Sequence, residues 1–331
     1  MKHYLLKLIN GETLSQDDTH DIMLNIISEK YNDQQTAALL MAIQMRGATV
    51  DELLGLRQGL LETGKYIDLE NYDTLDIVGT GGDGKNTFNI STCAAFVIAG
   101  AGYKVTKHGN GGSSSVSGAS NVLQGHGVKF TDDRDKLLRS LDKAGICYFH
   151  APLFAYGMKY VGPTRKALGV PTCFNLLGPL VNPCHPKNSL HGTANQAQLR
   201  LYTNLHQHIG DNYGVITSYD GYDEISLTSG FKLCTNLFEK VYTPKELGFN
   251  YVKPQELYGG ETPEEAMRLF DAVLEGTSAE GPKNVVLANA ACGIAIMDPN
   301  LSIAESVDIA RYSLESGKAL ATFHKFIELN S

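Results

Sequence analysis

The chain of 331 residues lacks the features that mark membrane, secreted and nucleic-acid-binding proteins. No apolar run approaches the roughly 20 residues that span a bilayer, and the first residues, Met1 to Lys7, are too short and too charged for a signal peptide. The six cysteines show no C-x-x-C spacing, which is typical of reduced thiols and not of a disulfide framework or a zinc site. The net charge of −8 argues against nucleic acid. We therefore expect a cytoplasmic protein without a membrane or nucleic-acid partner.

The hydrophobic content of 43% is enough for a substantial core, in one large or two unequal domains. The N-terminal part has helical signals, with sequences that resemble capping boxes beginning at Ser15 and Thr49. From Thr74 onward, predicted strands and helices alternate as in an α/β sheet. We expect a helical domain over residues 1–70 and an α/β domain over residues 71–331.

No internal repeat or low-complexity linker separates these two parts, so the sequence defines the boundary near residue 70 only softly. The later part of the chain has strand and helix patterns of ordinary length. A strand is predicted over residues 215–218, and helices are predicted over residues 262–274, 284–297 and 302–326.

Two turns stand out in the α/β part. The glycine-rich turn Gly79-Thr-Gly-Gly-Asp83 follows a predicted strand over residues 74–78, and the cationic turn Lys107-His-Gly-Asn110 follows another over residues 103–106. The apolar segment 89–100 between them predicts a helix, which completes a strand–helix–strand unit. In such a unit both turns lie at the same carboxyl edge of a parallel sheet. Backbone N–H groups and a helix N-terminus at that edge attract phosphate.

Several interpretations compete for the glycine-rich turn. It satisfies G-x-G-x-x-G, but a dinucleotide site needs an acidic residue near the end of the second strand, where Lys107 and His108 stand. It also satisfies G-x-x-x-x-G-K through Lys85, but Asn86 replaces the Ser or Thr of a P-loop. A turn that only allows tight strand-to-helix packing is a further alternative. Three glycines, an aspartate and the nearby cationic turn exceed what packing requires.

Separated motifs in order and spacing resemble the anthranilate phosphoribosyltransferase family, which is related in fold to the pyrimidine nucleoside phosphorylases. The motifs are Gly79-Thr-Gly-Gly-Asp83, Asn89-Ile-Ser-Thr92, Lys107-His-Gly-Asn110, Ser114-Ser-Val-Ser-Gly118, Phe174-Asn-Leu-Leu-Gly-Pro-Leu-Val-Asn-Pro183 and Asp220-Gly-Tyr-Asp-Glu-Ile-Ser226. The resemblance covers essentially the whole chain. It implies a nucleoside phosphorylase class II-like fold: a small helical domain, joined by helices from about residues 150–185, and a larger α/β domain with a central, mostly parallel sheet.

The activity implied by the resemblance is that of a glycosyltransferase (pentosyltransferase) of tryptophan biosynthesis. The enzyme would use Mg²⁺ and transfer the phosphoribosyl group of 5-phosphoribosyl 1-pyrophosphate to anthranilate. The family further suggests a homodimer through the helical domain, with Leu5, Leu6, Ala38 and Met41 as candidate contacts. Two alternatives remain: a pyrimidine nucleoside phosphorylase, and a paralogue that binds a phosphoribosyl ligand without turnover.

The resemblance also implies which residues bind each ligand. Residues 79–83 would wrap the pyrophosphate and ribose, residues 87 and 89–92 would hold the 5-phosphate, and Lys107 would face the pyrophosphate. The full phosphoribosyl-pyrophosphate set is Gly79, Gly81, Gly82, Asp83, Thr87, Asn89, Ile90, Ser91, Thr92, Lys107, His108, Gly109, Asn110, Gly111, Gly112, Ser113, Ser114, Ser115 and Ala119. The anthranilate set is Gly79, His108, Asn110, Arg165 and Gly178, and the metal set is Ser91, Asp223 and Glu224. No residue is assigned a certain catalytic role, and His108 is the candidate.

The chain departs from the family pattern after the cationic turn. Gly111 and Val116 stand where longer or basic side chains are common, and Ser120-Asn121 replaces an Ala-Asp pair. The stretch therefore loses at least one cation near the pyrophosphate, and backbone amides and serine hydroxyls are left to compensate. These departures concern phosphate binding more than the fold.

Overall fold

The computed structural model describes residues 1–111 and 118–331, which form two compact units. One unit, here called the helical unit, consists of residues 1–68 and 151–185, and the other, the α/β unit, consists of residues 69–150 and 186–331. The predicted fold class, a small helical domain plus a larger α/β domain, is confirmed.

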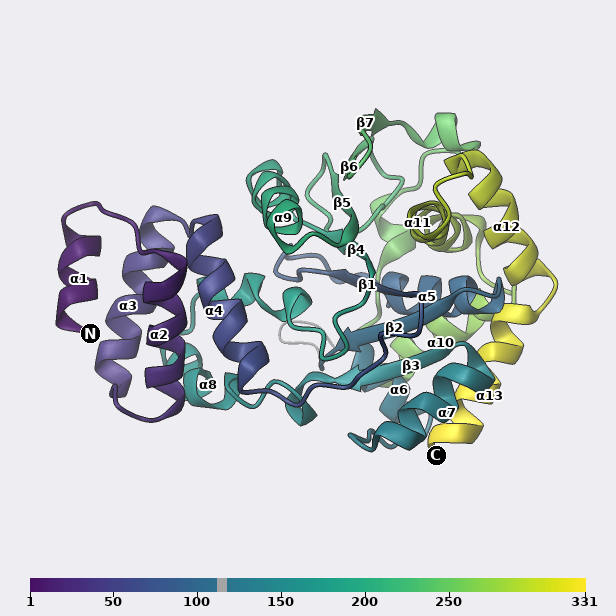
Figure 1. Cartoon of the computed structure of the whole chain (residues 1–331). Coiled ribbons are helices and arrows are strands. Elements are labelled where there is room, and N and C mark those ends of the chain that lie inside the picture. Colours follow the sequence, from purple (N-terminus) through teal and green to yellow (C-terminus); the bar gives the residue numbers. More distant parts are fainter. Residues whose placement is uncertain (112–117) are drawn as a thin grey trace. The chain divides into compact units, whose positions relative to one another are not determined.

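The helical unit is built from short, well-capped helices (Figure 1). Side chains of Ser15, Asn32 and Thr49 each accept a hydrogen bond from the third helical residue and so begin three of these helices. Gly55 lies against the backbone of α2, because an added Cβ there would collide with the Gln16 carbonyl oxygen. The elements are α1 (Lys2–Ile9), α2 (Gln16–Ile27), α3 (Asp33–Arg46), α4 (Val50–Glu62), η1 (Ala151–Leu153), α8 (Met158–Leu168), η2 (Cys173–Leu176) and η3 (Gly178–Leu180).

The α/β unit has one sheet of seven strands within the described residues, in the order β3-β2-β1-β4-β5-β6-β7. The first five strands along this order pair in parallel, and the last two pairings are antiparallel. The mostly parallel sheet is therefore as predicted. The strands are β1 (Thr74–Gly79), β2 (Lys104–Gly109), β3 (Ile146–His150), β4 (Asn188–Gly192), β5 (Asn212–Ser218), β6 (Phe231–Thr235) and β7 (Glu239–Tyr242).

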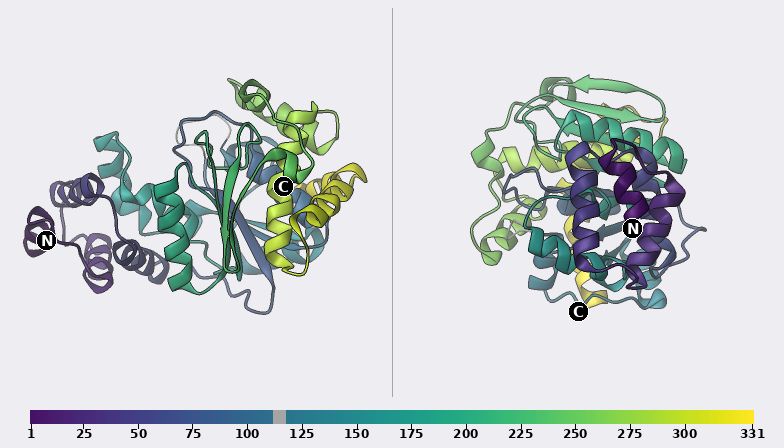
Figure 2. Two further views of the ribbon diagram at one scale, coloured as in Figure 1. Left: turned by 90° about the horizontal axis from the view of Figure 1, so that it is seen from above. Right: turned by 90° about the vertical axis from the view of Figure 1, so that its left-hand side faces the viewer.

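Helices cover both faces of this sheet, as two views show (Figures 1 and 2). On one face, α9 packs against β5, and on the other, α5 and α11 pack against the central strands. The core helix α5 is apolar all round and almost wholly buried. The remaining elements are α5 (Ile90–Gly100), α6 (Ala119–Gly125), α7 (Arg134–Ala144), α9 (Gln196–Ile209), η4 (Pro244–Leu247), η5 (Pro254–Leu257), α10 (Pro263–Leu274), α11 (Glu280–Met297), α12 (Ile303–Glu315) and α13 (Lys318–Asn330).

The sequence pattern misplaced two helix boundaries. The single helix predicted over residues 302–326 is two helices, α12 and α13, because Gly317 adopts a left-handed conformation (φ 78°) that ends one helix and precedes the next. Helix α11 begins at Glu280, four residues before the predicted start, and carries Pro282 in its first turn, where a missing N–H costs no helical hydrogen bond.

Gly100, the last residue of α5, allows close packing against α13. An added Cβ would lie 2.6 Å from Ser313 Oγ and 2.7 Å from the backbone nitrogen of Ala319. We expect Gly100→Ala to lower the free energy of unfolding of the α/β unit by about 1–3 kcal/mol, because the opposing backbone cannot rotate away. Urea unfolding followed by circular dichroism measures the change, and an unaltered midpoint would contradict this packing argument.

Candidate active site

The glycine-rich turn lies at the carboxyl end of β1. Gly81 and Gly82 have φ values of 71° and 77°, which side-chain-bearing residues rarely adopt. Gly79 and Gly192, at the paired ends of β1 and β4, lie so close to Asp223 that a Cβ on either would collide with it. The turn and the segment that contains Asp223 therefore fit together only because glycine stands at these positions.

Asp223 and Glu224 are buried side by side at this edge and are anchored by two backbone amides. The Gly81 N–H donates to Asp223 Oδ2 at 2.6 Å, and the Ser91 N–H, in the first turn of α5, donates to Glu224 Oε1 at 2.9 Å. The pair thus connects the glycine-rich turn to a helix N-terminus. The Asp83 carboxylate is also near, since its charge acts on both members of the pair.

Burial governs the electrostatics of the two carboxyl groups. Burial, followed by repulsion from Glu224 and Asp83, raises the pKa of Asp223 well above its usual range. Burial raises the pKa of Glu224 to about 7, although the hydrogen bond from Ser91 and the charge of Lys107 oppose the rise. Two adjacent carboxylates are therefore held where a nearby cation would stabilise their charged forms.

Lys107, from the cationic turn, lies beneath this edge with its ammonium turned inward. Its Nζ donates to the Ile77 carbonyl oxygen at 2.6 Å and to Ser91 Oγ at 3.4 Å. Burial lowers the pKa of Lys107, and the charges of Asp76 and Glu224 oppose that effect. The residue is only 1% exposed, and its charge acts on the buried Glu224 carboxylate.

The rest of the cationic turn is held from below and from the following helix. The His108 side chain is buried, and the His108 N–H donates to Asp76 Oδ1 at 3.1 Å. Asn110 Oδ1 accepts a hydrogen bond from the Gly111 N–H at 2.8 Å, and the Asn110 carbonyl accepts one from the Ser120 N–H at 3.2 Å. Gly109 pairs with His150 in β3, and Ala119 begins α6. Predicted residues Gly112, Ser113, Ser114 and Ser115 lie outside the described residues.

The expected 5-phosphate residues gather at the N-terminus of α5. Asn89 is the N-cap, and Ile90, Ser91 and Thr92 form the first turn of the helix, where backbone N–H groups and the helix dipole favour anions. Asn89 Oδ1 accepts the Thr92 hydroxyl at 3.3 Å. Thr87 is held by a bridge to Tyr258. All of these belong to the α/β unit, together with the turn residues and the carboxylate pair.

Arg165 and Gly178 belong to the helical unit. Arg165, on α8, donates from Nη2 to Asn175 Oδ1 at 3.3 Å, and its guanidinium lies 6.0 Å from the centre of the Phe174 ring. Burial lowers the pKa of Arg165. Gly178 begins η3, which is tied to α4 because Arg57 Nε donates to the Leu180 carbonyl at 2.8 Å. The predicted anthranilate residues therefore divide between the two units.

Two structural partners of the site were not among the predicted residues. Asp76 is fully buried and orients the His108 backbone, and its signal in the sequence was a charged residue inside an otherwise apolar strand. Gly192 has no Cβ and so leaves room for the backbone of Asp223. Its signal in the sequence was a glycine at the end of a strand. Both act through the residues that the motifs did identify.

The residues present fit a magnesium ion in their donor chemistry. Ser91, Asp223 and Glu224 offer hard oxygen atoms, and Mg²⁺ typically takes few protein carboxylates and fills its shell with phosphate and water. Over residues 1–111 and 118–331, no cluster of three or more His, Cys, Asp or Glu side chains forms a complete metal site. The pair thus suits a metal that a phosphorylated ligand helps to bind.

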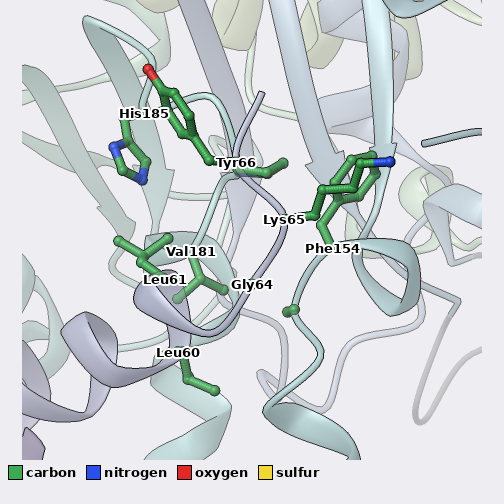
Figure 3. Close-up of a pocket in the computed structure, with 10 residues that line it drawn as sticks. Leu60, Leu61, Gly64, Lys65, Tyr66, Phe154, Val181 and His185 are labelled. Atoms are coloured by element: carbon green, nitrogen blue, oxygen red, sulfur yellow. The ribbon is translucent and has the colours of Figure 1, made fainter. Parts of the chain in front are cut away.

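A pocket inside the helical unit has a different character (Figure 3). The rings of Tyr66 and His185 lie there with centres 5.1 Å apart and planes tilted by 51°, while Lys65 lies alongside Phe154. Its remaining lining is mainly aliphatic, from Leu60, Leu61, Ala155, Val181 and Pro183. None of the predicted substrate or metal residues lines it.

Across the two described stretches of the chain, the helices are too short or too polar to cross a bilayer.

Comparison with known proteins gives a consistent result over the whole chain. The model of the glycosyl transferase family, a/b domain, matches residues 71–320, and that of the glycosyl transferase family, helical bundle domain, matches residues 2–64. The anthranilate phosphoribosyltransferases of Phocaeicola vulgatus and Bacteroides fragilis are 56% and 54% identical to the chain over 331 and 330 residues, with full coverage of each protein.

Solved structures agree with these relatives. Anthranilate phosphoribosyltransferase from Thermus thermophilus superposes with a TM-score of 0.92 at 30% identity and covers 98% of each chain. The enzyme from Saccharomyces cerevisiae in complex with phosphoribosyl pyrophosphate (PRPP) and Mg has a TM-score of 0.92 at 27% identity and covers 99% of this chain and 96% of that one. The family predicted from the motifs is confirmed: the chain belongs to the anthranilate phosphoribosyltransferases, which are pentosyltransferases of the glycosyl transferase family.

Proposed function

We propose that the chain catalyses the magnesium-dependent transfer of the phosphoribosyl group from PRPP to the amino group of anthranilate. The products are N-(5-phosphoribosyl)anthranilate and pyrophosphate, and the reaction is a step of tryptophan biosynthesis. The carrying observation is the buried Asp223–Glu224 pair, which joins the glycine-rich turn to the N-terminus of α5. Two relatives that match the chain over their full length are anthranilate phosphoribosyltransferases, which supports this assignment.

The phosphoribosyl substrate suits the carboxyl edge of the sheet. Displacement of pyrophosphate at C1 of the ribose develops positive charge on the sugar and negative charge on the leaving group, so the protein must position and stabilise charge. We assign the pyrophosphate and ribose to Gly79, Gly81, Gly82 and Asp83. The first turn of α5, with Thr87 before it, takes the 5-phosphate through backbone amides and hydroxyls.

Mg²⁺ fits at Asp223, Glu224 and the Ser91 hydroxyl, where it would neutralise charge on the leaving pyrophosphate. The complex of the yeast relative with PRPP and Mg supports this metal. The two carboxylates supply negative oxygens, and Lys107 holds the Ser91 hydroxyl in place from beneath. The chain's part is thus to present a fixed, buried set of oxygen atoms to the ligand.

Anthranilate needs a cation for its carboxylate and a slot for its ring. We assign the carboxylate to Arg165, because a guanidinium can bind it through two parallel hydrogen bonds whereas the ammonium of Lys166 cannot. Gly178 and, from the α/β unit, Gly79, His108 and Asn110 complete the anthranilate set. Yeast relatives in complex with 4-fluoroanthranilate support binding of such a ring. The aryl amine is neutral at pH 7, so His108 is not required as a strong base.

We further propose a cytoplasmic homodimer. The six cysteines are free and buried, which supports a reducing compartment. On α1 of the helical unit, Leu6 and Ile9 are 49% and 75% exposed, and these apolar side chains support association through that unit. Of the expected contacts, Ala38 is exposed, whereas Leu5 and Met41 are half-buried.

One assay tests the activity. PRPP, Mg²⁺ and anthranilate are supplied, and the loss of anthranilate fluorescence is followed. A parallel reaction with a pyrimidine nucleoside and inorganic phosphate tests the phosphorylase alternative, which the transferase relatives do not favour. Turnover in the second reaction alone, or in neither, would overturn the proposal.

The metal assignment predicts the effect of changing both carboxylates. Asp223→Asn together with Glu224→Gln should reduce magnesium-dependent turnover by at least about 100-fold and leave the fold intact, since amides keep the shape but not the charge. Glu275→Gln, at an exposed carboxylate after α10, is the matched control. Wild-type activity of the double variant in saturating Mg²⁺ would show that the pair does not act on the metal.

The carboxylate pair also predicts a pH-dependent cost in stability without metal. The pKa of Glu224 is raised to about 7 in the folded state, so folding favours its protonated form; the cost is absent below the unfolded pKa and is complete above about pH 7. Glu224→Gln should therefore raise the free energy of unfolding by about 1–3 kcal/mol at pH 8 and leave it nearly unchanged at pH 4. Metal-free urea unfolding at both pH values measures this, and a less stable variant at pH 8 would refute it.

The anthranilate assignment predicts a selective effect at Arg165. Arg165→Ala should weaken the binding of anthranilate by about 30- to 150-fold, because a charge-assisted, partly buried contact contributes about 2–3 kcal/mol to the binding free energy. The KM for PRPP should change little. Lys166→Ala, at the exposed neighbouring cation, is the control. Equal weakening of both substrates would remove Arg165 from the anthranilate site.

A further inference from the structure

Lys85 is a cation two residues after the glycine-rich turn, and none of the assigned roles uses it. Its side chain is exposed, and its Nζ lies 4.7 Å from the centre of the Tyr222 ring. Tyr222 directly precedes the Asp223–Glu224 pair in the chain. The ammonium therefore contacts the residue next in the chain to the carboxylates to which we assign the metal and the leaving pyrophosphate.

The backbone around Lys85 is fixed on both sides. The Lys85 N–H donates to Asp83 Oδ1 at 3.0 Å. Asn86 is held to a second segment of the unit, since its Nδ2 donates to the Gly260 carbonyl at 2.9 Å and its carbonyl accepts the Gly259 N–H at 2.7 Å. The backbone of Lys85 is therefore fixed, and its long, flexible side chain can still rotate and move the ammonium.

The negative charges at this edge of the sheet would be stabilised by a further cation. Asp83, Asp223 and Glu224 place three carboxylates there, while the ammonium of Lys107 is buried and already donates to Ile77 and Ser91. The substrate adds phosphate charges of its own. A divalent metal and one buried lysine leave an anion-rich edge, which an exposed lysine can offset.

We propose that Lys85 is a further substrate-binding residue, whose ammonium leaves the Tyr222 ring to bind the pyrophosphate group of PRPP. The assignment rests on the proposed function. The Tyr222 face holds the cation only weakly when exposed to water, whereas a lysine–phosphate contact is charge-assisted on both sides and is stronger. The ring thus keeps the ammonium near the site without competing with the substrate.

The test compares Lys85→Gln and Lys85→Arg with a matched control, Lys318→Gln. Lys318 is also exposed and also lies over a tyrosine, 4.8 Å from the Tyr312 ring centre, but it begins α13 and carries no assigned role. Calorimetric titration with magnesium pyrophosphate and with PRPP measures binding without turnover. We expect Lys85→Gln to weaken both by about tenfold, to reduce the salt dependence of binding, and to leave the KM for anthranilate unchanged.

Lys85→Arg should recover most of the lost affinity, because it keeps the charge, and Lys318→Gln should bind as the wild type does. A variant Tyr222→Leu, which removes the ring but keeps the lysine, should retain pyrophosphate affinity within about twofold. Unchanged pyrophosphate binding by Lys85→Gln would overturn the proposal. Equal losses in Lys85→Gln and Tyr222→Leu would also overturn it, since Lys85 would then only brace the ring.

Failure of the proposed function would give a different result. In that case the wild type binds magnesium pyrophosphate but does not consume anthranilate, and the effect of Lys85→Gln on pyrophosphate binding still decides the role of Lys85.

Discussion

The structure of the site depends on two hydrogen bonds to buried carboxylates. The Gly81 amide holds Asp223 and the Ser91 amide holds Glu224, so one dipeptide ties a turn after β1 to the N-terminus of α5. A helix N-terminus and a glycine turn both present N–H groups to anions. Here the protein's own carboxylates use some of these donors, and the pair is therefore placed where phosphate charge and a metal ion are expected to meet. Positioning and charge compensation follow from the same contacts.

This arrangement requires the close approach of three backbone segments, namely the end of β1, the end of β4 and the segment that contains Asp223. Gly79 and Gly192 end two neighbouring parallel strands, and each lacks the Cβ that would collide with Asp223. The buried Asp76 carboxylate accepts the His108 N–H and so orients the adjacent cationic turn. Parallel pairing of β1 with β2 and β4 brings the carboxyl ends of these three strands to one edge of the sheet. The positions of the site's side chains therefore depend on the backbone geometry.

Much of this could be predicted from the sequence, for identifiable reasons. The glycine-rich and cationic turns have local signatures, and parallel pairing places both at one edge, so the fold class and the meeting of the two turns at this edge followed from the motifs. The inward direction of Lys107 could not be predicted, because it depends on the Ile77 carbonyl, which no motif marks. The break at Gly317 was missed because the apolar period continues across it, and only the left-handed φ ends the helix. The contact of Lys85 with Tyr222 joins residues far apart in sequence, so no local pattern indicates it.

Another buried carboxylate provides a contrast to the pair at 223 and 224. Glu52, in the helical unit, is fully buried, but it is paired with Arg46 and accepts the Leu14 and Thr49 backbone N–H groups at 3.0 Å each. Its charge is compensated within the protein, which is what a structural role requires. Asp223 and Glu224 instead place two like charges together, and burial raises the pKa of both. Such an arrangement opposes folding at neutral pH and would be relieved by a cation from outside the chain, which supports the proposed metal site better than a purely structural role.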